Sequence, residues 1–177
     1  MINIVLYQPE KPQNTGNIMR TCVATNAHLH IIGPLTFSLD EKALLRAGMD
    51  YIQELHYTVY KNLDEFLTSH DEKKIYYITR YGNKSPDQFN FSKVNEELYI
   101  MFGRESTGIP HELLRRNLER CIRIPMAPSA RSLNLSNAVA VVLYEVLRQQ
   151  NYYGLSTYEA IKGEDFLLKE NSANEKK

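Results

Sequence analysis

Three short stretches of the sequence combine residue types that bind polar ligands with glycines or prolines that expose the backbone. They cover residues 14–20, 103–110 and 127–134. The first has the spacing Asn-x-Gly-x-x-x-Arg, the second holds two glycines five positions apart, and the third combines serine hydroxyls with Arg131. Glycine lets the backbone approach a ligand closely, and a helix that begins after such a loop attracts anions. Taken alone, each stretch is explained more simply by an ordinary turn, a helix cap or a surface arginine.

Several other kinds of site are not supported by the sequence. The glycines at 103 and 108 match neither the G-x-G-x-x-G pattern of dinucleotide sites nor the Walker A loop of nucleoside triphosphate sites. No serine has the surroundings of a hydrolase nucleophile. The five histidines are scattered and Cys22 and Cys121 are the only cysteines, so we expect no metal site and no disulfide framework.

The composition predicts one globular domain. The 177 residues, of which 43% are hydrophobic and 24% charged, suffice for one sizeable core. We expect residues 1–160 to form the domain and residues 161–177 to form a partly flexible tail. The first apolar run is too short for a secretion signal, and no run approaches the ~20 residues that span a bilayer. Together with the unpaired cysteines, this predicts a cytoplasmic protein without a membrane partner.

The distribution of charged residues along the chain is more informative than the net charge. Lys+Arg and Asp+Glu both number 21, so the net charge is zero. Seven of the ten arginines nevertheless fall within residues 100–150, where there are four acidic residues and no lysine. The planar guanidinium suits phosphate, so this segment indicates an anionic partner. A solvated helix face, with Glu112 and Arg116 four positions apart, explains the cluster about as well.

Short apolar runs alternate with helical patterns along the chain. We predict strands at 2–7, 28–33, 54–59, 74–79, 98–103 and 121–125, and helices at 14–26, 41–47, 63–69, 111–117, 134–150 and 155–168, with 80–95 mainly loop. Asn14 or Thr15 would cap the first helix and Asp40 the second. Continuous apolar strands alternating with helices are typical of an α/β fold, so we predict a six-stranded, mostly parallel sheet with helices on both faces.

The predicted fold brings the three stretches together. In an open α/β sheet, ligands bind beyond the carboxyl ends of the strands, and the stretches follow the first, fifth and sixth strands. The helix at 134–150 is apolar nearly all round, with Val141, Tyr144 and Arg148 on a second face. Such a helix is either a central core helix or the seam of a homodimer, and we favour the seam because a small domain has few ways to cover both faces.

The three stretches together resemble the motifs of the SPOUT superfamily of RNA methyltransferases, in its ribose 2′-O-methylating branch. Asn14, Gly16 and Arg20 match the first motif, residues 100–110 with a Gly-x-Glu-x-x-Gly core resemble the second, and residues 122–125 with 132–138 resemble the third. The resemblance covers about residues 1–150. It implies S-adenosylmethionine as cofactor, a homodimer through the helix at 134–150 and a C-terminal trefoil knot.

The compact length narrows the resemblance to enzymes that methylate the ribose of the wobble nucleotide, a cytidine or modified uridine, in leucine tRNAs. Two alternatives stay open: a ribose methyltransferase for another tRNA or rRNA site, and a noncatalytic RNA-binding protein with the same knot. An unrelated α/β nucleotide-binding enzyme would need a phosphate loop that the sequence lacks.

The resemblance also implies roles for individual residues. Arg20 and Asn14 would act at the reacting ribose, and Arg20, which stays protonated, would grip a phosphate or hydroxyl rather than accept a proton. The residues expected to bind the cofactor are Ile78, Thr79, Gly103, Glu105, Ile122, Ile124, Ser132, Leu133 and Asn134. The residues expected to hold the anticodon stem-loop of tRNA are Arg104, Arg115, Arg116, Arg123 and Arg131.

Overall fold

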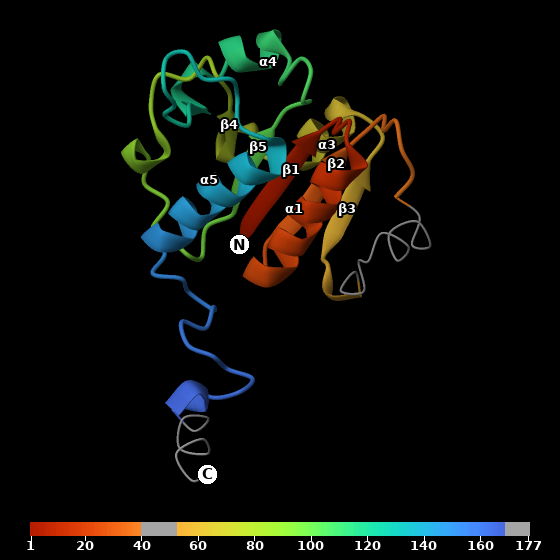
Figure 1. The fold of residues 1–177 in the computed structure, drawn as a ribbon. Coiled ribbons are helices and arrows are strands. Elements are labelled where there is room, and N and C mark those ends of the chain that lie inside the picture. The colour runs from red at the N-terminus through yellow and green to blue at the C-terminus, as the bar shows by residue number, and fades with distance from the viewer. Residues whose placement is uncertain (40–52, 169–177) are drawn as a thin grey trace.

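The computed structural model describes residues 1–39 and 53–168, and six strands form one sheet within them (Figure 1). The strands are β1 (Ile2–Tyr7), β2 (His28–Ile32), β3 (Tyr57–Tyr60), β4 (Ile75–Ile78), β5 (Leu98–Phe102) and β6 (Cys121–Ile122). Their order across the sheet is β3-β2-β1-β5-β4-β6, and every pairing between them is parallel. The predicted α/β class and strand number are confirmed, with an all-parallel sheet in place of a mostly parallel one.

Helices cover both faces of the sheet, as predicted. The longer helices α1 (Pro12–Thr25) and α5 (Leu135–Gln149) pack on one face, and the short helices α3 (Leu63–Ser69) and α4 (His111–Arg115) on the other. Short 3₁₀ turns occur at η2 (Glu72–Lys74), η3 (Pro86–Gln88) and η4 (Leu118–Arg120).

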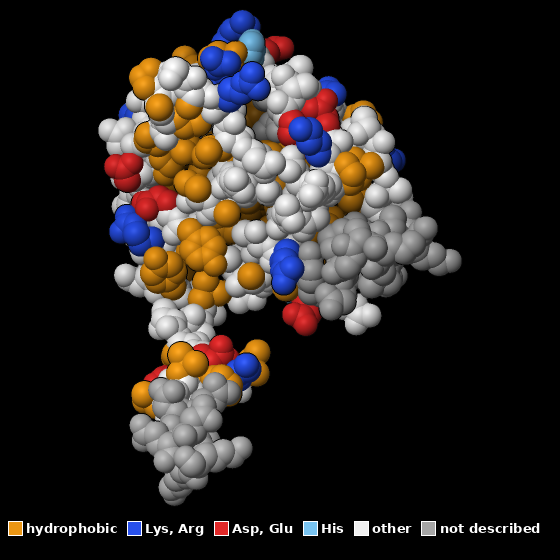
Figure 2. All heavy atoms as spheres, in the orientation of Figure 1, with side chains coloured by type: hydrophobic (Ala, Val, Ile, Leu, Met, Phe, Trp, Pro, Cys, Tyr) orange, Lys and Arg blue, Asp and Glu red, His pale blue; other side chains and the backbone are white. Residues whose placement is uncertain are grey.

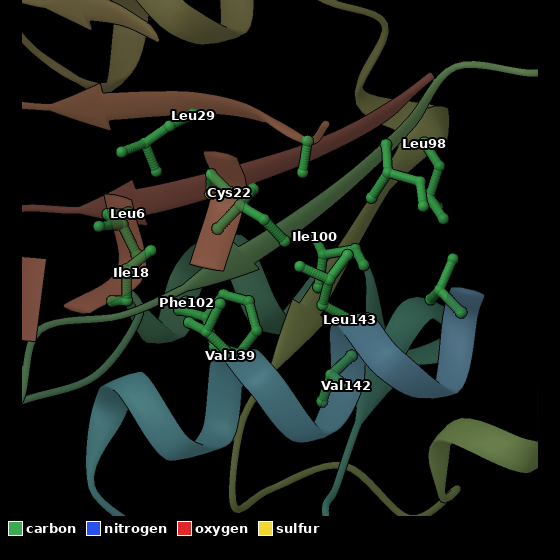
Figure 3. Packing of buried hydrophobic residues seen from close by; sticks show 14 of the residues in the cluster. Leu6, Ile18, Cys22, Leu29, Leu98, Ile100, Phe102, Val139, Val142 and Leu143 are labelled. Atoms are coloured by element: carbon green, nitrogen blue, oxygen red, sulfur yellow. The ribbon is translucent and has the colours of Figure 1, made fainter. Parts of the chain in front are cut away.

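Alternate residues of β1, in the middle of the sheet, belong to two separate hydrophobic clusters. Leu6 of β1 lies in one cluster with Ile18 of α1 and Val139 of α5, as Figure 3 shows. Val5, one position earlier, lies in the other cluster with Phe66 of α3. Because side chains of a strand alternate between faces, a strand buried on both sides reads as a continuous apolar run.

Some predicted boundaries are wrong. The first helix begins at Pro12, not near Asn14, because proline suits the first helical position, and Lys11 stands at its N-cap without a side-chain capping bond. The sixth strand ends at Ile122 instead of 125, since the next amide, that of Arg123, donates to the Lys84 carbonyl at 2.9 Å outside the ladder.

The last predicted helices had different outcomes. The helix at 134–150 is confirmed as α5, capped by the Asn134 side chain, which accepts a hydrogen bond from the Ser136 amide. Residues 155–165 form turns where a helix was predicted, and helical structure begins only at Phe166. The predicted helix at 41–47 with its Asp40 cap lies outside the described residues. Within the described residues, no helix is long and apolar enough to cross a membrane.

The strand register brings the three motif stretches to one edge of the sheet. Leu6 of β1 lies opposite Phe102 of β5, Phe102 lies opposite Ile78 of β4, and Ile78 lies opposite Ile122 of β6. The four strands therefore end side by side, and the segments that follow them emerge together. This convergence is the arrangement predicted from the sequence.

Candidate active site

A cleft of about 490 Å³ lies at this edge of the sheet. Four segments contribute to its walls: the start of α1 with Lys11 and Asn14, the end of β4 with residues 78–81, the loop after β5 with residues 102–109, and the segment from Arg123 to Ala138. Small-molecule sites in proteins have volumes of roughly 300–1,000 Å³. The cleft is therefore large enough for a ligand the size of a nucleoside.

Most residues expected to bind the cofactor line this cleft. They are Ile78, Thr79, Gly103, Glu105, Ile124, Ser132, Leu133 and Asn134. Ile122 does not line it: its side chain is fully buried in the core, and its carbonyl accepts a hydrogen bond from the Thr79 amide at 2.9 Å. Ile122 thus anchors the segment after β4.

Gly103 is a glycine because two stretches of backbone meet there. A Cβ atom at this position would lie only 2.6 Å from the Cα of Gly108. The loop closes on itself through two bonds, in which the amides of Arg104 and Gly108 each donate to the other's carbonyl, at 3.2 and 2.9 Å. Gly108 has a φ of +74°, which favours glycine. Both glycines of the motif therefore shape the loop that forms one wall of the cleft.

A chain of hydrogen bonds joins the three motif stretches. The Glu105 carboxylate accepts from the Asn14 side-chain amide at 2.9 Å, and the Asn14 side-chain oxygen accepts from the Asn134 side-chain amide at 2.9 Å. Glu105 also accepts from the backbone amides of Glu10 and Lys11 at 2.8 and 3.3 Å. It therefore supplies negative charge at the positive end of α1, where the helix has no capping side chain of its own.

Glu10, which lies just before α1, contacts the loop after β5 with its own carboxylate. Glu10 accepts from the backbone amide and the hydroxyl of Ser106, both at 2.8 Å, and from the Arg104 guanidinium at 3.1 Å. The bonds from Ser106, and after them those from Arg104, lower the pKa of Glu10. Arg104, expected to bind RNA, thus directs part of its guanidinium toward Glu10 while it also lines the cleft.

The other predicted RNA-binding arginines separate into two groups. Arg123 and Arg131 come together, with Arg80, around a second hollow of about 350 Å³ beside the cleft. Arg116 instead forms a two-pronged ion pair with Glu72, at 2.9 and 3.0 Å, and Arg115 is exposed on α4. Figure 2 shows Lys and Arg side chains gathered at the end of the molecule that carries α4.

Two further outcomes concern residues around the site. Arg20 is exposed on α1 and does not belong to the lining of the cleft, whereas Asn14 is buried and does. Lys11, Arg80, Tyr81 and Met126 line the cleft without having been predicted. For Arg80 and Tyr81, the available signal was their position directly after a strand end. Among the described residues, no group of three or more His, Cys, Asp or Glu side chains is placed to hold a metal ion.

Comparisons with known proteins show which family the chain belongs to. Residues 1–144 match the model of the SpoU rRNA Methylase family. A Geobacillus stearothermophilus protein, provisionally named tRNA (cytidine(34)-2′-O)-methyltransferase, is 50% identical over 155 residues, which cover 88% of this chain and 99% of that protein.

Two solved structures are similar over most of their length. A provisionally named RNA methyltransferase from Bacillus anthracis superposes with a TM-score of 0.85 at 48% identity and covers 88% of this chain and 98% of its own. A structure described as giving insights into the 2-OH methylation of C/U34 on tRNA superposes with a TM-score of 0.76 at 38% identity and covers 85% and 97%. The chain therefore belongs to the SpoU rRNA methylase family.

Proposed function

We propose that this protein transfers a methyl group from S-adenosylmethionine to the ribose 2′-oxygen of nucleotide 34 in tRNA. That nucleotide is a cytidine or a modified uridine. The observation that carries the proposal is the hydrogen-bonded chain Glu105–Asn14–Asn134, which joins one residue from each motif at one cleft. Membership of a methylase family gives the reaction class. The relatives named for position 34 of tRNA point to the target.

The cleft suits the proposed cofactor in size and in chemistry. Ile78, Ile124 and Ala138 offer apolar surface for a flat ring, and Thr79 and Ser132 offer hydroxyls beside it. We assign the cofactor to these residues together with Gly103, Leu133 and the backbone of the Gly103–Gly108 loop. When bound, S-adenosylmethionine supplies an electrophilic methyl group on a sulfonium centre.

The chain's own residues must hold the ribose hydroxyl in line, because a neutral hydroxyl is a weak nucleophile. We assign this role to Arg20, whose guanidinium has only hydrogen-bond donors and would hold a phosphate or hydroxyl of the target nucleotide. Both polar atoms of the Asn14 side chain are engaged, by Glu105 and Asn134. Asn14 therefore acts as the brace that fixes the start of α1, the helix that carries Arg20.

The test is methylation in vitro. Purified protein is incubated with labelled S-adenosylmethionine and unmodified transcripts of leucine tRNAs and of other tRNAs, and the methylated position is mapped. A 2′-O-methyl group at nucleotide 34 of leucine tRNAs is the expected result. A methyl group elsewhere would move the target to another site, and RNA binding without methyl transfer would point to a noncatalytic protein.

We further propose that the protein is a homodimer with α5 as its seam. Val141 and Tyr144 of α5 are each 49% exposed, although Val139, Val142 and Leu143 of the same helix are buried in the core. Figure 2 shows hydrophobic side chains gathered over α5 on the visible face. An apolar helix face that the protomer leaves uncovered is what a second copy would bury.

The trefoil knot is also a proposal, and the path of the chain supports it. β6 lies at the edge of the sheet, beside β4. The chain then returns so that Val142 and Leu143 of α5 pack in one cluster with Ile4 of β1 and Ile100 of β5, over the centre of the sheet. A knot in this region requires such a return from the edge to the centre.

A further inference from the structure

The turn after β4 is held in place from both sides. The Thr79 amide donates to the Ile122 carbonyl at 2.9 Å before the turn, and the Arg123 amide donates to the Lys84 carbonyl at 2.9 Å after it. Gly82 packs directly on the neighbouring chain, because a Cβ atom there would lie 2.7 Å from the backbone of Ile122. The backbone of residues 79–84 is therefore fixed before any ligand arrives.

This fixed turn presents an exposed aromatic ring at the mouth of the cleft. Tyr81 lines the cleft and is 59% exposed. Its ring makes an edge contact with His111, with centroids 5.1 Å apart and planes at 86°, and the Arg80 guanidinium lies 5.9 Å from its centroid. A mostly exposed ring contributes little to the core. An exposed ring carried on a fixed backbone can stack against an unpaired base.

Beside this ring lies the second hollow, with three arginines. Arg80, Arg123 and Arg131 line it, and its lining contains no acidic side chain. The Arg123 guanidinium donates to the Arg80 carbonyl at 2.6 Å, which ties these two lining residues together. Within the described residues, none of the three forms an ion pair with a carboxylate. Guanidinium groups that have no carboxylate partner suit the oxygens of a phosphate.

We propose that this surface reads the nucleotide that is methylated: Tyr81 stacks on its base, and Arg80, Arg123 and Arg131 hold an adjoining phosphate. The inference rests on the proposed function, since it places the ribose between ring and hollow, at the mouth of the cofactor cleft. The hollow adjoins the cleft, because the two share the lining residues Arg80, Arg123, Met126 and Ser132. Acidic peptides or free phosphate would use the arginines but not the ring.

The ring is tested with three variants in tRNA methylation and in binding to an anticodon stem-loop RNA. Tyr81→Ala is expected to raise the KM for tRNA and the Kd for the stem-loop by about tenfold or more, as loss of one stacked base does. Tyr81→Phe keeps the ring and is expected to stay within about twofold of wild type. Tyr158→Ala removes a ring that is 60% exposed, nearly as much as Tyr81, and is expected to change neither value.

The arginines are tested by salt dependence. Arg80→Gln, Arg123→Gln and Arg131→Gln should each weaken stem-loop binding at low salt and flatten the dependence of log Kd on log salt by about one unit of slope or less. Lys73→Gln removes an exposed charge in η2 and should leave the slope unchanged. In Arg131→Gln, whose side chain lines the hollow but not the cleft, the Kd for S-adenosylmethionine should match that of wild type.

The results separate this inference from the proposed function. Wild-type methylation at nucleotide 34 with unchanged KM and Kd in Tyr81→Ala would overturn the inference and leave the function standing. So would a Tyr81→Phe variant as weak as Tyr81→Ala, since the hydroxyl would then be the contact. If wild type methylates another position, the function fails, and the stem-loop binding data still decide whether ring and arginines hold RNA.

Discussion

Gly103 shapes the wall of the cleft because it has no side chain. In Gly103→Ala, the new Cβ would lie 2.6 Å from the Gly108 Cα, so the loop must open. We expect binding of S-adenosylmethionine to weaken at least about tenfold, or ~1.4 kcal/mol, in calorimetry. Gly154→Ala is the control, because a Cβ atom there meets open space and Gly154 lies outside the lining of the cleft. Its φ of +78° disfavours alanine, so this variant also controls for a general loss of stability. Unchanged affinity in Gly103→Ala would contradict the placement of the cofactor.

Replacement of Arg20 should impair methyl transfer without weakening cofactor binding. Because Arg20 lies outside the lining of the cleft, Arg20→Ala should keep the wild-type affinity for S-adenosylmethionine. Its single-turnover rate at saturating tRNA should fall by about 10²-fold or more, the usual effect of removing one positioned charged donor. Asn17→Ala, an exposed change on the same helix, is the control and should keep the wild-type rate. A wild-type rate in Arg20→Ala would show that this arginine does not act at the ribose.

Sequence patterns identify residues whose type is forced by the backbone or by a fixed partner. Gly103 and Asn134 are of this kind, because a loop closure and a helix cap each admit few residue types. Tyr81 and Glu10 carry no such signal, since any polar segment holds tyrosines and glutamates. Their positions become informative only when β1, β4 and β5 are known to end side by side. The contact between Glu10 and Arg104 spans 94 positions, so no local pattern could indicate it.

Two loops are locked together by reciprocal hydrogen bonds. Glu105 accepts from the amides of Glu10 and Lys11, and Glu10 accepts from the Ser106 amide, so each segment supplies a carboxylate to the backbone of the other. In Glu10→Ala, the loop at 103–108 loses its bonds to the segment before α1 on one side. We expect faster hydrogen exchange of the Ser106 amide and roughly threefold to tenfold weaker cofactor binding.

A matched variant makes this prediction specific. Glu112→Ala removes an exposed carboxylate from α4, outside the lining of the cleft, and should leave both hydrogen exchange and affinity unchanged. Exchange of Ser106 at the wild-type rate in Glu10→Ala would mean that the Gly103–Gly108 closure alone holds the loop.

A strand or helix was predictable from the sequence where its pattern of apolar residues determines its bounds. β1, β5 and α5 are long, buried and bounded by capping or turn residues, and the structure has them within about one residue of the prediction. β6 is an edge strand with one neighbour, so the paired length depends on where β4 ends and not on its own sequence. The order of the strands depends on which way each connection crosses the sheet, which periodicity does not encode.

A buried histidine in the outer half of the sheet should make the whole molecule less stable at acid pH. His30 of β2 is hydrogen-bonded to Tyr60 of β3 at 2.9 Å and to Asn3 of β1 at 3.1 Å. Burial, and then the nearby His28 and His70, lower its pKa from 6.5 to about 3. The unfolded chain therefore binds a proton that the folded chain excludes, so the stabilisation is complete above about pH 6.5 and is lost as the pH falls toward 3.

We expect the free energy of unfolding, measured by urea denaturation, to fall by about 2 kcal/mol between pH 7 and pH 5 from this group. His30→Gln should be less stable at pH 7 but should lose much of this dependence on pH. His111→Gln, which changes an exposed histidine, should retain the wild-type dependence. An equal pH dependence in His30→Gln would assign the acid sensitivity to other groups.

The assembly of the whole molecule should depend on one face of α5. Val141 is 49% exposed on a helix whose opposite face is core, and burying it against a second copy would remove apolar surface from water. Wild type should sediment at twice the chain mass of 20.5 kDa, and Val141→Arg should sediment as a monomer because a charge cannot be buried unpaired in the seam. Val59→Arg provides the control, since Val59 has the same 49% exposure on β3 and should leave the dimer intact. A monomeric wild type, or a dimer that persists in Val141→Arg and dissociates in Val59→Arg, would place the interface away from α5.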